Sequence, residues 1–432
     1  MEPLSLISQL LDRALQSGAE AAEVFYSAAL SQPVFFEANR LKQLERSQSS
    51  GLALRLWRNS APGLAVAHGP VDPQRLVDKA IALSELNDPE TVDLVQGSTM
   101  AYPDVGRAVS TDQLIDWGEK AIALVREAYP NVLCSAEWDC EAETTRLTNT
   151  NGLNISYTDT TLSCGLTAEW IRGDDFLGIS DGQTRRFQLN PDVLAEQIIQ
   201  QLRWAEISAQ PIVGKGLVLF TSKAADMLWD TVQAALNGKQ VLEQTSPWCD
   251  RHDQQVVSTL INLDQRPQIG PFSCPFDDEG YRTRPLTLIK NGVLRSFYSD
   301  RTVGLALGSD TTGNGFRPDL GSYPTPGLVN VVIQPGPLSF KDLLHSMSSG
   351  LIVDQMLGDG AGISGDFAIN IDLGYRVENG EIVGRVKDTM VAGNIYTVLN
   401  HVIALGNDGQ WNGACFTPSI LVEGLSVTGK SG

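Results

Sequence analysis

The residues that could ligate a metal or act as nucleophiles are few and scattered. None of the histidines has a second histidine at ligand spacing on one helix; they are His68, His252, His345 and His401. The cysteines include no C-x-x-C pair, so free thiols are expected; they are Cys134, Cys140, Cys164, Cys249, Cys274 and Cys415. Cys415 alone is more typical of an inert thiol than of a nucleophile. The spacing of these histidines and cysteines in the sequence therefore indicates no zinc site.

Two other stretches contain residue types at a spacing that could form a catalytic or binding site. The carboxylates of DDEG, residues 277–280, could serve acid/base work or bind a divalent cation, but a solvated turn is the favoured interpretation. GAGISG, residues 360–365, matches G-x-G-x-x-G, yet the following DFAINIDLGYRV alternates as a strand. A dinucleotide site needs a helix there. We expect instead a glycine-rich loop that lets backbones approach closely.

A helix is predicted over residues 223–238, KAADMLWDTVQAALNG, directly after the apolar run GLVLF. A strand that leads into a helix often carries an active site, but this segment has no His, Cys, Glu or Arg. Ser222 is a plausible cap and Gly238 a plausible stop. The predicted core-facing stripe includes Leu228, Val232, Ala235 and Leu236. The predicted polar face consists of Asp226, Asp230, Gln233 and Asn237.

The amino-acid composition restricts the class of protein to which this chain can belong. The chain has 432 residues, 42% of them hydrophobic and 19% charged, which predicts a globular protein with more than one domain. Its formal charge of −19 disfavours direct nucleic-acid binding. No apolar run approaches the ~20 residues that span a bilayer. The N-terminus is predicted to be an amphipathic helix over 4–17, not a signal peptide, so a cytoplasmic location is expected.

The order of predicted elements indicates an α+β protein. Residues 1–105 and 106–210 each contain a helix, about four strands and a second helix, which we interpret as an internal duplication; the pattern alone fits two unrelated α+β units about equally well. Residues 211–432 contain many short strands with Asn-Gly turns, at 291–292 and 379–380 among others. Only 338–347 and 395–405 look helical besides 223–238. We expect a barrel-like or sandwich-like C-terminal domain.

Several motifs, taken in order, resemble one family. They include GLVLF–TSKAADMLWDTVQAALNGKQVLEQ, DDEGYRTRPLTLIKNGVLRSFYSDRTV, TGNGFRP, GISGDFAINIDLGYRVENGEIVGRV and VAGNIYTVL. Together they resemble the TldD/PmbA (TldD/TldE) family of zinc metallopeptidases, also described as modulators of DNA gyrase. The resemblance implies an α+β N-terminal region and a barrel-like C-terminal domain, as the residue patterns do.

The resemblance also implies a site. TldD-type members carry His-Glu-x-x-x-His on the helix after the first C-terminal strand; the two His and a late Cys hold zinc, and the Glu activates water. In the best register, Trp229 stands at the first His, Asp230 at the Glu and Ala234 at the second His, while Cys415 matches the late Cys. The chain is therefore similar to PmbA/TldE-type subunits that lack the motif. No cofactor is expected in this chain alone, and zinc is expected in a TldD-type partner.

The expected function is that of a non-catalytic subunit in a complex that degrades or trims peptides. Its partner would be a TldD-type subunit, or a second copy of itself in a homodimer. The alternative is a stand-alone homo-oligomeric peptide-binding or scaffold protein; a hydrolase that uses Cys415 or a carboxylate pair is less favoured. Candidate peptide-cavity residues from the family motifs are Asp277, Asp278, Asn314, Gly365 and Asn394.

Overall fold

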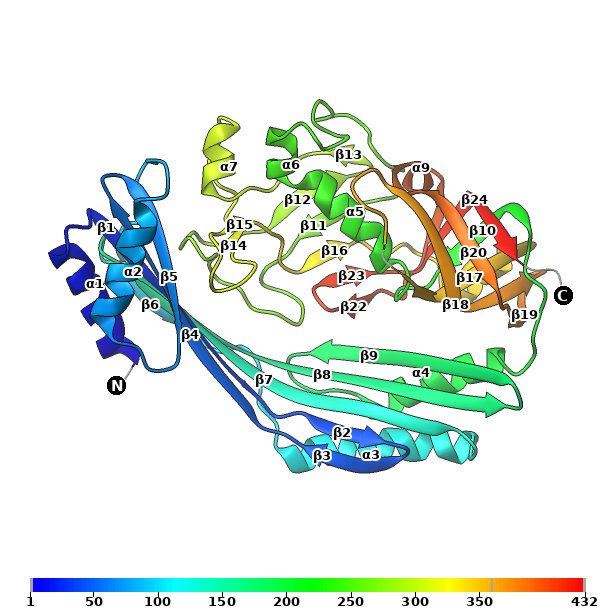
Figure 1. Ribbon diagram of the computed structural model, residues 1–432. Helices are drawn as coiled ribbons and strands as arrows, with labels where there is room; N and C mark the ends of the chain where they lie inside the picture. Colours follow the sequence, from blue (N-terminus) through cyan, green and yellow to red (C-terminus); the bar gives the residue numbers. More distant parts are fainter. Residues whose placement is uncertain (1–2, 359, 430–432) are drawn as a thin grey trace.

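The computed structural model describes residues 3–358 and 360–429. Figure 1 shows two parts that face each other. A long twisted sheet carries helices at both of its ends, and a strand-rich C-terminal domain lies along one side of it. The joint between the two parts follows residue 204 and precedes residue 214.

Within the described ranges, the N-terminal part forms one nine-stranded sheet. Its strands are β1 (Ala21–Ser31), β2 (Val34–Glu37), β3 (Arg40–Leu44), β4 (Ser47–Arg58), β5 (Ala61–His68), β6 (Thr99–Tyr102), β7 (Leu133–Asn149), β8 (Asn154–Arg172) and β9 (Asp175–Arg185). β1 pairs antiparallel with both β4 and β7. The two predicted sets of about four strands are therefore joined in a single sheet, with five strands from residues 21–68 and three long strands from residues 133–185.

Three helices of this part begin at residues whose side chains cap the first turn. Asp72, Ser110 and Asn190 each accept a hydrogen bond from a backbone N–H of the first turn, which is the usual role of an N-cap. Pro73 and Pro191 occupy first helical positions, where a missing N–H costs nothing. The helices are α1 (Pro3–Gln16), α2 (Pro73–Ser84), α3 (Thr111–Ala128) and α4 (Pro191–Trp204).

In the C-terminal part, five strands of the described residues close into a barrel. β10 pairs parallel with β17 on one side and antiparallel with β24 on the other, which leaves it no free edge. The barrel strands are β10 (Gly214–Phe220), β17 (Ser349–Leu357), β18 (Asp366–Glu378), β20 (Thr389–Asn394) and β24 (Ile420–Gly429). β19 (Glu381–Arg385) extends β18, and β21 (Val402–Leu405) pairs with β24. This confirms the barrel-like interpretation.

A second sheet of short strands lies beside the barrel. Its path is β13-β12-β11-β16-β23-β22. These strands are β11 (Leu263–Gln265), β12 (Leu286–Lys290), β13 (Val293–Leu294), β16 (Val331–Ile333), β22 (Gln410–Asn412) and β23 (Cys415–Thr417). A separate pair is formed by β14 (Gly315–Phe316) and β15 (Thr325–Pro326).

Both predicted Asn-Gly hairpins are confirmed. Asn291 and Gly292 join β12 to β13 with φ of 48° and 75°. Asn379 and Gly380 join β18 to β19 with φ of 51° and 80°. These left-handed conformations are what a tight two-residue hairpin turn requires and what this residue pair tolerates.

Short helices complete the C-terminal part. They are α5 (Asp226–Leu236), α6 (Gly238–Leu242), α7 (Arg301–Ala306), α8 (Phe340–His345) and α9 (Ile395–Asn400). α8 lies within the predicted 338–347, and α9 confirms the first half of the predicted 395–405, whereas residues 402–405 form β21 instead of helix. The expectation that no helices exist beyond these and α5 is wrong, because α6 and α7 are also present. Neither is longer than 6 residues, too short to show a helical period in the sequence. Within the described ranges, no helix combines the length and apolarity needed to cross a bilayer.

Candidate functional site

The helix that the family pattern singles out, α5, is buried in the C-terminal core. Its apolar residues share one cluster with side chains of the barrel and of the six-stranded sheet. Leu228, Val232 and Leu236 are 0% exposed, which confirms the predicted stripe. The expected cap is wrong: α5 begins at Asp226, its N-cap is Ala225, and no side chain caps it. Residues 221–225 form turns first, because the chain must leave β10 before the helix can start.

Trp229 fills the place that the register assigns to the first zinc-binding histidine. Its side chain is 0% exposed, and its indole Nε1 donates a hydrogen bond to Thr417 Oγ1 at 2.8 Å. Thr417 lies on β23, two residues after Cys415. The indole therefore ties α5 to the strand that carries the late cysteine, and it does so as a packed, hydrogen-bonded core residue.

The structure places Cys415 against Asp226, one helical turn before Trp229. The buried Cys415 thiol lies beside the Asp226 carboxylate, whose Oδ1 has no hydrogen-bond partner among the described residues. Burial is the main cause that raises the pKa of Asp226, to about 6, while the neighbouring thiol lowers it. Burial also raises the pKa of Cys415, and the Asp226 charge raises it further. The pair thus keeps the sulfur protonated.

Sequence reasoning missed this partner of Cys415. It placed Asp226 on a solvent-facing polar side, which is wrong: the side chain is half-buried and faces β23. The signal that could have found it is the spacing of three residues from Trp229, which puts both on one helix face. Asp230, at the position of the family's Glu, is exposed, and Ala234 is half-buried.

The residues present do not fit a catalytic zinc ion. Such a site takes thiolate, imidazole or carboxylate ligands, usually three from the protein. Here the first position holds an indole, the second histidine position a methyl group, and the thiol is held protonated. All four histidines are exposed; the ring nitrogens of His252 and His401 lie 2.9 Å and 2.7 Å from backbone carbonyls of Arg295 and Thr397. Among the described residues, no group of three or more His, Cys, Asp or Glu is arranged to hold a metal.

The DDEG carboxylates lie inside the protein, so the expected solvated turn is wrong. Asp277 is 0% exposed; its Oδ1 accepts the Tyr281 N–H at 2.8 Å and its Oδ2 accepts the Gly315 N–H at 2.9 Å. Asp278 accepts the Arg317 N–H at 2.7 Å, and burial raises its pKa to about 6. The cause is tertiary: the N-terminal sheet covers this turn, and Gly280 packs against side chains of its strands. The carboxylates of Asp277 and Asp278 therefore accept hydrogen bonds from backbone N–H groups of the protein itself.

The other candidate cavity residues have different surroundings. Asn314 is 0% exposed and donates to Gln265 Oε1 at 2.6 Å and to the Gly327 carbonyl at 2.7 Å. Asn394 caps α9 and donates to the Ser364 carbonyl at 2.9 Å.

Gly365 ends the glycine-rich loop, with φ of 82°. This loop contacts α5, because Thr231 Oγ1 donates to the Ala361 carbonyl at 2.9 Å. It continues into β18 and not into a helix, as expected. Gly365 and Asn394 are therefore brought toward α5, whereas Asn314 is not joined to it by any hydrogen bond of the described residues.

Comparison with known proteins agrees with this geometry. Residues 213–429 match the family model described as PmbA/TldA metallopeptidase C-terminal domain. The chain belongs to the PmbA/TldD metallopeptidase family. Residues 22–84 match the model of that family's domain 1. The C-terminal match includes α5 and β23, so both segments of the site lie in the family domain.

Relatives in the PmbA/TldD family are distant in sequence. "Metalloprotease PmbA" of Escherichia coli O157:H7 is 28% identical over 219 residues, which are 50% of this chain and 46% of that protein. The chain thus spans about half the length of this curated relative. A "Metalloprotease" of Methanothermobacter thermautotrophicus is 23% identical over 444 residues, 97% of this chain and 92% of that one.

A solved structure shares the whole fold. The crystal structure of TldE from Thermococcus kodakarensis superposes with a TM-score of 0.90 at 22% identity, covering 98% of this chain and 100% of that one. At this identity, the likeness concerns the fold alone. The barrel, the second sheet and the long N-terminal sheet are thus a family architecture.

Proposed function

We propose that the chain is a non-catalytic subunit of a PmbA/TldD-type metallopeptidase that acts on peptides. The observation that carries the proposal is Trp229, which occupies the first ligand position of the family's motif as a buried, hydrogen-bonded core residue. A zinc ion cannot replace a packed indole without unpacking α5 from β23. The protonated Cys415–Asp226 pair supports the same conclusion.

The partner proposed is a TldD-type subunit that carries an intact His-Glu-x-x-x-His. The likeness of the fold to a protein named TldE supports this choice. In such a complex, this chain would contribute walls and strand edges for an extended peptide, since backbone pairing recognises peptides without a reactive group.

Metal content tests the non-catalytic part of the proposal. The chain is purified alone, dialysed against a chelator and analysed for zinc. We expect far less than one zinc per chain, because α5 supplies no paired ligands. Cys415→Ser is the control, and it should leave the metal content unchanged. About one zinc per chain that survives dialysis, and that Cys415→Ser removes, would refute the proposal.

Peptide cleavage tests the partnership. The chain and a TldD-type subunit are co-expressed, and a mixed peptide library is digested by each alone and by the pair. We expect activity from the pair that disappears when the partner's motif Glu is replaced by Gln, and that persists in Asp230→Asn of this chain. Cleavage by this chain alone would overturn the proposal. Peptide binding by the chain alone, with no association with the TldD-type subunit, would establish the stand-alone binding protein instead.

A further inference from the structure

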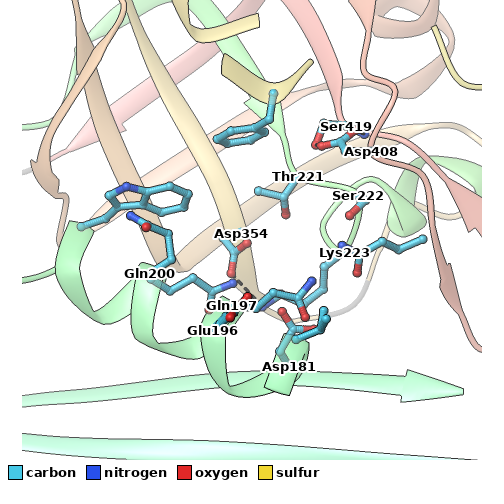
Figure 2. Close-up of a pocket in the computed structure, with 15 residues that line it drawn as sticks. Asp181, Glu196, Gln197, Gln200, Thr221, Ser222, Lys223, Asp354, Asp408 and Ser419 are labelled. Carbon is cyan, nitrogen blue, oxygen red and sulfur yellow. Dashed lines mark hydrogen bonds and ion pairs between the residues drawn. The ribbon is translucent and has the colours of Figure 1, made fainter. Parts of the chain in front are cut away.

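A pocket of about 410 Å³ lies between the two parts of the molecule. Figure 2 shows it at the carboxyl ends of the parallel strands β10 and β17, facing α4 and the edge of β9. Lys223 follows β10, Asp354 belongs to β17, Asp181 to β9, and Glu196 to α4. None of the four family-site positions on α5 and β23 is among the residues that line it, so the pocket is separate from that site.

The lining is acidic, and its one base among the described residues is already in use. Lys223 Nζ lies 2.7 Å from Asp354 Oδ2, 2.7 Å from the Ser180 carbonyl oxygen and 3.3 Å from Gln355 Oε1. Two of the three ammonium protons are donated to the Ser180 and Gln355 oxygens, and the charge is paired with Asp354. Lys223 therefore bridges β9 to β17, and the pocket offers acceptors without a free cationic donor.

Two buried acceptors in the lining accept no hydrogen bond from the described residues: Gln201 Oε1, and Asp354 Oδ2, which is ion-paired with Lys223. Gln201 of α4 is 7% exposed, and its Oε1 accepts no hydrogen bond from the described residues. An unpaired buried carbonyl costs free energy that a donor from a ligand would recover. Nearby, burial raises the pKa of Asp181 although Lys223 lowers it. Both groups favour a ligand that brings N–H donors and positive charge.

An aromatic wall completes the pocket. Trp204 and Phe340 stack with ring centroids 5.8 Å apart and planes 19° from parallel, and both line the cavity. Aromatic faces hold alkyl chains and attract organic cations. A metal ion without an organic group would make no use of the aromatic faces of Trp204 and Phe340. In addition, no cluster of three or more His, Cys, Asp or Glu within residues 3–358 and 360–429 is arranged for a metal.

We propose that this pocket binds an alkylammonium or alkylguanidinium group, such as a basic side chain of a peptide or a free amine of the same chemistry. The N–H groups bond to Asp181 and to Gln201 Oε1, Glu196 adds negative charge from the exposed side of α4, and the alkyl stem lies on Trp204. This site goes beyond the proposed function, because it requires neither zinc nor a second subunit.

Calorimetric titration of the full chain tests the ligand class with four probes. They are agmatine, an acetylated and amidated Ala-Arg-Ala peptide, the same peptide with neutral citrulline in place of Arg, and magnesium chloride. We expect the Arg peptide to bind at least about tenfold (about 1.4 kcal/mol) more tightly than the citrulline peptide. Agmatine binding without Arg-peptide binding assigns the site to free amines. Equal binding of both peptides together with no agmatine binding, or magnesium binding in place of the organic probes, would overturn the proposal.

Variants locate the binding. Asp181→Asn should weaken binding of the preferred probe about tenfold, because it removes a buried charge-assisted hydrogen bond. Glu196→Gln should weaken it about threefold, since Glu196 is exposed and screened. The matched control is Glu119→Gln, an exposed glutamate on the neighbouring helix α3 with the same change of charge. If Asp181→Asn fails to fold, Glu196→Gln still decides: an effect equal to that of Glu119→Gln would place the cation elsewhere and overturn the assignment.

Discussion

At the scale of single residues, Trp229 is a packing residue of the C-terminal core. Its ring fills the space between α5 and β23, and its N–H satisfies Thr417, so neither element can shift without losing the contact. Large buried aromatic side chains contribute strongly because the interior is close-packed and truncation leaves a cavity. Trp229 is thus one of the main supports of the C-terminal core.

Replacement of Trp229 should separate packing from hydrogen bonding. Trp229→Ala should lower the free energy of unfolding of the C-terminal part by about 3–5 kcal/mol, because it empties the indole's space. Trp229→Phe keeps a ring and should cost about 1–3 kcal/mol for a smaller cavity and for the loss of the donor to Thr417 Oγ1. Urea unfolding monitored by circular dichroism measures both. A loss below 1 kcal/mol in Trp229→Ala would show that the indole is not a support.

Some features of the site follow from local sequence and others do not. The stripe that includes Leu228 and Val232 is predictable because helical periodicity is a property of one segment. The proximity of Cys415 and Asp226 is not predictable, since 189 positions separate the two residues and only tertiary packing joins them. The burial of Asp277 is equally invisible in DDEG, because the strands that cover it come from the other half of the chain.

At the scale of elements, β9 shows how a sheet edge is closed by side chains. Gln355 of β17 accepts the Ser180 N–H at 2.7 Å and donates to the Gly178 carbonyl at 3.2 Å. One side-chain amide thus satisfies a donor and an acceptor two residues apart, as a neighbouring strand would. Arg385 donates to the Phe176 carbonyl at 3.5 Å farther along the same edge. The N-terminal sheet is therefore terminated by the C-terminal part.

Removal of the Gln355 side-chain amide should expose the edge of β9 to water. Gln355→Ala should cost about 1–2 kcal/mol and should speed hydrogen exchange of the Ser180 amide about tenfold, because a paired N–H becomes open to water. Exchange is followed by mass spectrometry of the peptide that contains β9. Gln48→Ala, an exposed glutamine on β4, is the control and should change neither quantity. Unchanged exchange at Ser180 would mean that the edge is protected by something other than Gln355.

Element prediction succeeded where the signal was local. The Asn-Gly turns and the Asp72, Ser110 and Asn190 caps are dictated by backbone chemistry of a few residues, and they are present. The joining of two strand sets into one sheet was not predicted, because the β1–β7 pairing depends on long-range register. For the same reason, the patterns favoured a barrel-like domain without specifying which strands close it.

At the scale of the whole molecule, a buried charge cluster joins the two parts. Glu23 of β1 is 1% exposed; its Oε1 lies 2.8 Å from Arg55 Nη2 and 3.2 Å from Arg317 Nη2. Glu279 of the C-terminal part lies beside them and accepts the Arg301 N–H at 2.8 Å. Burial is the main cause that raises the pKa of Glu279 to about 7.

This cluster should make stability depend on pH. An acid whose pKa rises on folding, here from 4.5 to about 7, binds its proton more tightly in the folded state. The free energy of unfolding should therefore fall as pH rises through this window, by about 3 kcal/mol. Glu279→Gln should flatten the decline, and Glu119→Gln should not. Denaturant unfolding at several pH values measures it; a decline that is the same in both variants would assign the dependence to other groups.

The closed barrel also has a consequence for synthesis on the ribosome. β10 is made early, but its antiparallel partner β24 follows it by roughly 200 residues, so translation at about 5–20 residues per second delays closure by about 10–40 s. The strands of the N-terminal sheet are all complete by residue 185. Over this interval the nascent chain carries a complete N-terminal sheet and an open barrel, in which the apolar β10 has no partner until β17 is made and lacks β24 until the end. We expect chaperone binding to the nascent chain to be strongest in this interval, when the apolar surface of β10 is exposed.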